Sequence, residues 1–94
     1  MGRGSRTIRF TCTDADTWYK VFDESDYNNR RIQEIRIKLE ETSTADHFRY
    51  NKDGNTSNYN TSTSGVCHIR DAKKVYVMVP TTAAQVVEID VTYK

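Results

Sequence analysis

Hydrophobic and polar residues alternate along several segments of the chain, which is the pattern of a β-strand with one buried side. In residues 35–40, for example, Ile35, Ile37 and Leu39 are each followed by a charged residue. This pattern predicts strands over residues 7–12, 35–40, 74–79 and 87–93, and less regular ones over 17–22, 46–52, 58–62 and 65–70. About eight short strands at such regular spacing indicate a β-sandwich or barrel.

Residues 30–41 leave a helix open as the alternative, because Ile32, Ile35 and Leu39 also fit a helical stripe. A helix would turn Ile37 toward water, so we favour a strand there. Between strands, Asp53-Gly54 predicts a tight hairpin turn, and Pro80 is expected to end the strand before it.

The composition supports the same fold class. The chain has eight Val, six Ile and twelve Thr but a single Leu, and β-branched residues favour strands whereas Leu fills helix interfaces. Its 94 residues provide material for one core. We therefore predict an all-β protein: a single-domain antiparallel β-sandwich, Ig-like or jelly-roll-like, over residues 6–94, after a flexible basic N-terminal arm over residues 1–5.

Charge and hydropathy exclude some function classes. The formal net charge is +1, which argues against a nucleic-acid partner held by bulk charge. No apolar run reaches the roughly 18 residues of a membrane span, and no secretory signal is recognised at the start. These features predict a protein made in the cytoplasm, with no membrane partner.

Cys12 and Cys67 lie on different predicted strands. In the reducing compartment expected here, two buried thiols are favoured over a disulfide, although a bridge between facing strands stays open as the alternative. Neither cysteine belongs to a Cys-x-x-Cys pair, which removes redox and zinc-ribbon interpretations.

Candidate chemistry is sparse. His47 and His68 are the only histidines, and the acids near Asp14 and Asp23 lack the pattern of a helix-loop-helix calcium site. We interpret these acids as solvated turn residues, with a weak calcium site as the alternative. No nucleophile motif or phosphate-binding glycine loop is found. We predict no catalytic residue, no metal and no cofactor.

Aromatic residues are the most informative remaining feature. Trp18 and Tyr19 are adjacent, so in a strand one of them faces outward, and Tyr76 shares the predicted wet side of its strand with Met78. Exposed aromatics on a sheet serve protein contacts or sugar stacking. The alternative is that Trp18 is the central core aromatic and the tyrosines cover edges.

Two passages resemble small structural proteins of tailed bacteriophage virions. Residues 47–54 are similar to a hairpin of that class with aromatic, basic and aromatic residues before an Asp-Gly turn, and residues 74–79 with 84–89 are similar to its final hairpin. Residues 18–22 are compatible with the same class, whereas the Asn- and Thr-rich stretch before Gly65 departs from it. The resemblance implies a β-sandwich that decorates or cements a particle, located in the virion, without an active site.

We therefore expect a non-enzymatic structural protein, a virion decoration or minor capsid component, that binds protein partners (its own copies or a capsid or tail shell) as a homo-oligomer. Near-zero net charge would limit repulsion between copies, and residues 7–12 and 86–93 could offer sheet edges. A carbohydrate-binding module using Trp18, Tyr19, Tyr27 and loop acids is the alternative. The predicted partner contacts are Arg3, Arg6, Arg9, Trp18, Tyr19, Tyr76 and Met78.

Overall fold

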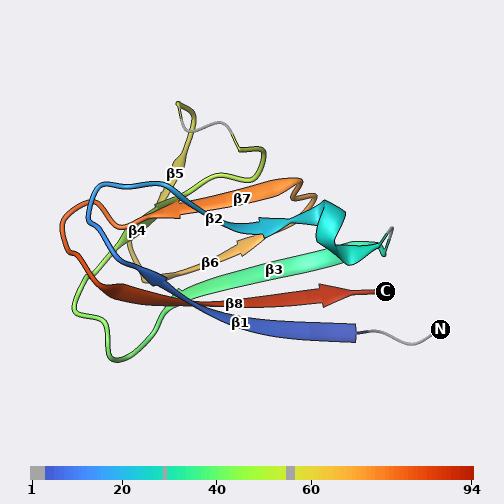
Figure 1. Cartoon of the computed structure of the whole chain (residues 1–94), viewed down its shortest axis with the longest axis horizontal. Coiled ribbons are helices and arrows are strands. Elements are labelled where there is room, and N and C mark those ends of the chain that lie inside the picture. The colour runs from blue at the N-terminus through green and yellow to red at the C-terminus, as the bar shows by residue number, and fades with distance from the viewer. Residues whose placement is uncertain (1–3, 29, 55–56) are drawn as a thin grey trace.

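The computed structural model describes residues 4–28, 30–54 and 57–94, and within them the chain forms eight strands and one 3-10 helix (Figure 1). Each of the eight segments predicted as a strand overlaps one of these strands. The elements are β1 (Gly4–Cys12), β2 (Tyr19–Asp23), η1 (Glu24–Tyr27), β3 (Ile32–Leu39), β4 (Phe48–Tyr50), β5 (Asn60–Ser62), β6 (Val66–Ile69), β7 (Lys74–Met78) and β8 (Gln85–Tyr93).

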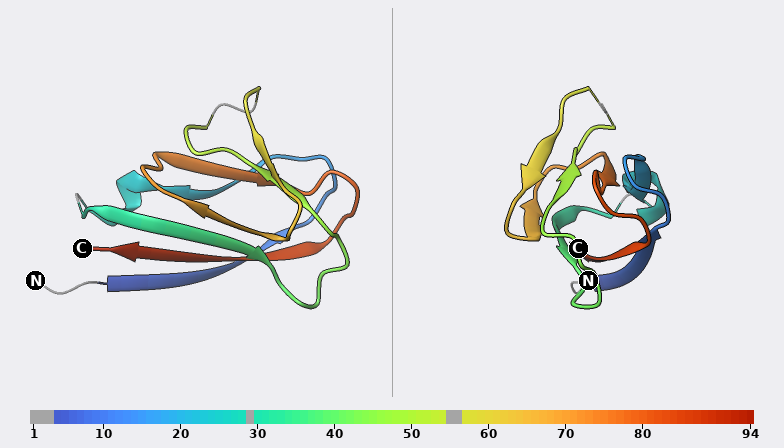
Figure 2. Two further views of the ribbon diagram at one scale, coloured as in Figure 1. Left: turned by 180° about the vertical axis from the view of Figure 1, so that it is seen from behind. Right: turned by 90° about the vertical axis from the view of Figure 1, so that its left-hand side faces the viewer.

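The strands form two antiparallel four-stranded sheets. Sheet A has the order β1-β8-β3-β6, and sheet B has the order β2-β7-β4-β5. The pairs are nested along the chain, since β1 pairs with β8, β2 with β7, β3 with β6 and β4 with β5. A long hairpin folded over on itself in this way is a jelly roll. The predicted β-sandwich is confirmed, and Figure 2 shows its two layers from behind and from one end.

Strand alternation builds the core between the sheets. Ile35 and Ile37 on β3, Val87, Ile89 and Val91 on β8, and Val75 and Val77 on β7 are each 0% exposed. Burying one such side chain contributes about 1.5–3 kcal/mol to stability. The helix considered over residues 30–41 is wrong, because only a strand directs Ile35 and Ile37 to the same side.

Two expectations about the chain's path need correction. Residues 4 and 5, predicted to belong to a flexible arm, pair with Tyr93 and Thr92 as the start of β1. Residues 86–93 offer no sheet edge, because β8 lies between β1 and β3. β1 is an edge strand, as expected.

The tight hairpin predicted at Asp53-Gly54 is also wrong. A two-residue turn of that type needs positive φ at both central residues, whereas only Gly54 has it, at 81°. The chain instead runs on toward β7, where Asp53 bridges to Lys74, and the Gly54 N–H donates to Asn51 Oδ1.

The nested pairing sorts the connections to the two ends of the sandwich. The connections β1–β2, β3–β4, β5–β6 and β7–β8 lie at one end, on the left in Figure 1. The β2–β3 connection with η1, the β6–β7 connection, the start of β1 and the end of β8 lie at the other end.

Candidate interaction surface

An aromatic and basic cluster lies on the outer face of sheet B. The Trp18 and Tyr59 rings are 5.8 Å apart between centroids and tilted by 54°, and the Arg49 guanidinium carbon lies 4.9 Å from the Tyr59 centroid. We call Trp18, Arg49 and Tyr59 the sheet B cluster. Tyr59 is 41% exposed and is the only large hydrophobic residue in the described ranges that counts as exposed.

Strand periodicity explains why these side chains face outward. Phe48 and Tyr50 on β4 belong to or pack on the core, so Arg49 between them points away from it. Tyr19 lies opposite the buried Val77 and faces inward, which leaves its neighbour Trp18 on the outer side. Tyr59 precedes β5, the strand that pairs with β4.

Arg49 makes no ion pair with any residue in the described part of the chain. Its Nε atom is buried and has no hydrogen-bond acceptor there. The guanidinium is instead held against the Tyr59 ring, an attraction between a cation and an aromatic face. Its positive charge therefore remains uncompensated beside the Tyr59 ring.

The two adjacent aromatic residues predicted as contacts, Trp18 and Tyr19, lie on opposite sides of sheet B. Trp18 faces outward but is half-buried and stands outside the core cluster, so the alternative of a central core tryptophan does not hold. Tyr19 is wrong as an outward contact, because its ring packs on Phe10 at 5.5 Å and its hydroxyl accepts from the Asp14 N–H. Phe48, 0% exposed, is the largest fully buried side chain.

Tyr76 and Met78 lie on the outer side of β7, as predicted, but Met78 is only 5% exposed. Met78 lies opposite Arg49 of the neighbouring strand β4, and its side chain is buried. The prediction of Met78 as a free contact is therefore wrong. Tyr76 is half-buried, and a Cβ added at Gly54 would meet its ring at 3.5 Å.

The arginines predicted as an arm do not join this cluster. Arg9 donates two hydrogen bonds of 2.6 Å to the Glu40 carboxylate, which raises the pKa of Arg9 and lowers that of Glu40. Arg6 lies opposite Val91, with its guanidinium carbon 5.9 Å from the Tyr27 centroid. Arg3 falls outside the described residues.

On the outer face of sheet A, charged and polar side chains pair across neighbouring strands. Arg36 donates to Asp90 at 2.8 Å, Lys38 lies 4.0 Å from Glu88, and His68 Nδ1 lies 2.6 Å from Glu34. The Thr7 hydroxyl completes the set by donating to Asp90 at 2.8 Å. Opposite charges across neighbouring strands pair with one another at these positions.

The two cysteines are free and cannot form the disulfide that was left open. Cys12 on β1 and Cys67 on β6 lie on opposite edges of sheet A. Three strand spacings of about 4.8 Å separate them by at least about 14 Å, twice the distance a bridge spans. Burial raises the pKa of Cys12 to about 11 and that of Cys67 to about 12, which suits inert core thiols.

The loop acids act within their turns. Asp23 caps η1 by accepting from the Ser25 N–H and hydroxyl, and it also accepts from Lys20. These donors lower its pKa to about 2. In the described ranges, no three His, Cys, Asp or Glu side chains gather as metal ligands would. Tyr27, considered for sugar contacts, is 7% exposed and stacks on Phe22.

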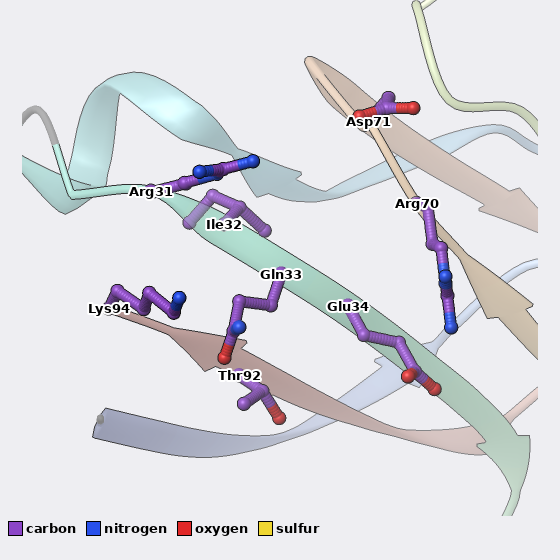
Figure 3. A pocket seen from close by; sticks show the side chains of 8 residues that line it. All are labelled: Arg31, Ile32, Gln33, Glu34, Arg70, Asp71, Thr92 and Lys94. Carbon is purple, nitrogen blue, oxygen red and sulfur yellow. The ribbon is translucent and has the colours of Figure 1, made fainter.

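An open cleft of about 540 Å³ lies at the end of sheet A where the β8 strand stops (Figure 3). Its side chains come from the start of β3, the end of β6 and the end of β8. Arg31, Arg70 and Lys94 supply its positive charge, Glu34 and Asp71 its negative charge, and Ile32, Gln33 and Thr92 complete the lining.

Sequence reasoning missed Arg49, although the alternation around Phe48 and Tyr50 marks it as outward-facing and could have identified it. Tyr59 is predicted from the sequence to be an aromatic in a loop or on a wet face, and the structure shows it exposed. It is not among the predicted partner contacts, because its polar surroundings do not link it to Trp18.

Comparison with protein-family models, with curated proteins and with solved structures gives no match for this chain. Within the described residues, no helix has the length and apolar character needed to cross a membrane.

Proposed function

We propose that this protein is a non-enzymatic structural protein that attaches to neighbouring protein subunits, as a decoration or minor capsid component of a virion. The observation that carries the proposal is the sheet B cluster. Tryptophan, tyrosine and arginine are the residues that dominate the binding energy of protein interfaces, and here they stand together on one outer face.

The contrast between the two outer faces supports this assignment. In the middle of sheet A, Arg36 and Lys38 are paired with acids on β8, whereas Arg49 on sheet B carries an uncompensated charge next to an exposed ring. A partner that covers Trp18 and Tyr59 and supplies a carboxylate to Arg49 would gain both apolar burial and a charged hydrogen bond.

The topology is compatible with the same function. Jelly rolls serve as viral capsid domains and as lectin domains. Since a fold alone does not determine function, this is support by analogy, and the choice between the two rests on the surface.

A carbohydrate-binding module remains the second candidate, because Trp18 and Tyr59 form an outward aromatic pair. Their planes are tilted by 54°, so they do not form one flat platform for a sugar. Tyr19 and Tyr27, which would have extended the platform, face the core. These two observations favour a protein partner.

Sedimentation velocity and native mass spectrometry of the purified chain test the proposal. We expect assemblies larger than a monomer, weakened by Tyr59→Ala and unchanged by Arg36→Ala, the matched control on sheet A. Antibodies against the chain should also label particle surfaces in micrographs of source material. A monomer at every concentration, with label only in the particle-free fraction, would overturn the proposal.

Titration with oligosaccharides, followed by Trp18 fluorescence, tests the second candidate. Because Trp18 is the single tryptophan, its emission reports this face alone. A saturable change would favour sugar binding, and an unchanged spectrum across a broad sugar panel would exclude it.

A further inference from the structure

The two ends of the sandwich differ in charge, although the net charge is only +1. The connections of one end contain no Lys or Arg, whereas the other end carries cations together with acids such as Glu24 and Asp26 on η1. The first of these ends carries the connections over residues 13–18, 40–47, 63–65 and 79–84. We call this the acidic end, and its exposed carboxylates belong to Asp14, Asp16, Glu41 and Asp46.

The acidic end keeps some carboxylates free of cations. Asp46 lies 2.6 Å from His47 Nδ1, and Asp14 lies 3.4 Å from the Tyr19 hydroxyl, which donates to it. Asp16 and Glu41 are exposed and form no ion pair with a residue in the described ranges.

The opposite end carries the cleft of Figure 3, where three cations stand on three separate segments. Arg31, Arg70 and Lys94 are exposed, and their side chains make no ion pair with residues 4–28, 30–54 or 57–94. Of the two acids in the cleft, Glu34 is already held by His68 at 2.6 Å. Gln33 and Thr92 add neutral hydrogen-bonding groups.

We infer that this basic cleft receives the acidic end of a second copy, so that subunits join head to tail. The inference rests on the proposed function, because the end-to-end contact would be a second contact between copies, beside that of the sheet B cluster. Charge complementarity selects the occupant: the acidic end, whose connections contain no Lys or Arg, meets a cleft whose three cations form no ion pair with a described residue. Such a contact joins two different surfaces, so it produces rings or filaments rather than closed dimers.

Ionic strength provides the first test. Exposed charges are screened within about 10 Å at about 0.1 M salt and within about 3 Å at about 1 M. End-to-end association of the wild-type chain, measured by sedimentation velocity, should therefore fall as salt is raised. Association that does not change with salt would overturn the inference.

Charge reversal provides the decisive test. Arg31→Glu with Arg70→Glu makes both ends acidic, and Asp16→Lys with Glu41→Lys makes both ends basic. Each variant alone should associate through its ends about tenfold or more weakly than the wild type, because like charges then meet. Mixed in equal amounts, the two should associate again. A chain carrying all four changes has its polarity inverted and should also recover association.

If the mixture shows only the weak association of its two components, the inference is overturned. It is also overturned if the wild-type cleft binds polyphosphate and the mixture does not associate. Circular dichroism should show all variants folded, since each change is at an exposed position.

Tyr59→Ala separates the two proposals. It should weaken the sheet B contact and leave the salt-dependent association intact. Loss of one behaviour without the other therefore identifies which proposal fails.

Discussion

The two outer faces of the sandwich are built from the same kind of alternating strand but are completed differently. On sheet A, Arg36 and Lys38 pair with Asp90 and Glu88 on β8, and His68 on β6 forms a hydrogen bond with Glu34 on β3. On sheet B, the outward positions carry Trp18, Arg49 and Tyr59, which contact one another but leave a charge and a ring open. A surface whose charges are paired within the subunit stabilises the subunit, whereas a surface with an unpaired charge and an exposed ring is suited to binding a partner.

The largest effect should come from the core that both faces share. Ile37→Ala is expected to lower the free energy of unfolding by about 2–5 kcal/mol, because a fully buried side chain leaves a cavity. Lys38→Ala, the next residue on the outer side of β3, should change it by less than about 1 kcal/mol. Urea denaturation measures both. Equal effects would mean that the inward and outward sides of β3 are wrongly assigned.

The next effect concerns the face of sheet B. Tyr59→Ala should weaken protein association by about 30-fold, the cost of about 2 kcal/mol that defines an interface hot spot. Its effect on unfolding should be small, because the side chain is 41% exposed in the subunit. Sedimentation velocity and urea denaturation of the same sample separate the two quantities. A variant that unfolds readily but associates normally would assign Tyr59 to stability alone.

Arg36→Ala on sheet A should show the opposite behaviour. It removes the 2.8 Å contact with Asp90 on a partly exposed face, so the free energy of unfolding should fall by about 0.2–1 kcal/mol. Association should stay unchanged. A loss of association comparable to that of Tyr59→Ala would remove the distinction between the faces.

The smallest effects are those of acid pH. Arg9 lowers the pKa of Glu40 below its ordinary 4.5, and the hydrogen bonds from Ser25 lower that of Asp23 from 3.8 to about 2. A lowered pKa stabilises the fold above the ordinary value and loses that contribution as pH falls through the folded value. Stability should therefore decline from pH 4.5 downward.

Glu40→Gln and Asp23→Asn separate these contributions. The first should flatten the upper part of the acid decline, and the second the part between pH 3.8 and about 2. Urea denaturation at a series of pH values measures both slopes. A variant with an undiminished slope would show that the carboxyl does not supply the linkage.

Local patterns predicted the strands well because strand periodicity depends on neighbouring residues. Ile35 and Ile37 alternate with charges, and this was enough to place their side chains in the core. The order of the strands in each sheet could not be predicted from local patterns, because it depends on pairings such as Gly4 with Tyr93 that join distant parts of the chain. The same distance explains why residues 4 and 5 were taken for an arm.

The surface was predicted only in part, for physical reasons that differ between residues. Adjacency required Trp18 and Tyr19 to face opposite sides but could not say which faced out. Met78 is outward by periodicity and yet buried, because coverage by neighbouring strands is a tertiary property. Tyr59 lies in a stretch of polar residues, where no alternation assigns a side.

The fluorescence of Trp18 as the protein concentration rises tests the central claim most directly, provided that high salt suppresses the end-to-end contact. If the sheet B cluster is the contact surface, the emission shifts to shorter wavelength and iodide quenching decreases over the same concentrations at which sedimentation shows assembly. If the mass increases while Trp18 emission and quenching stay constant, the contact lies elsewhere and the account is wrong.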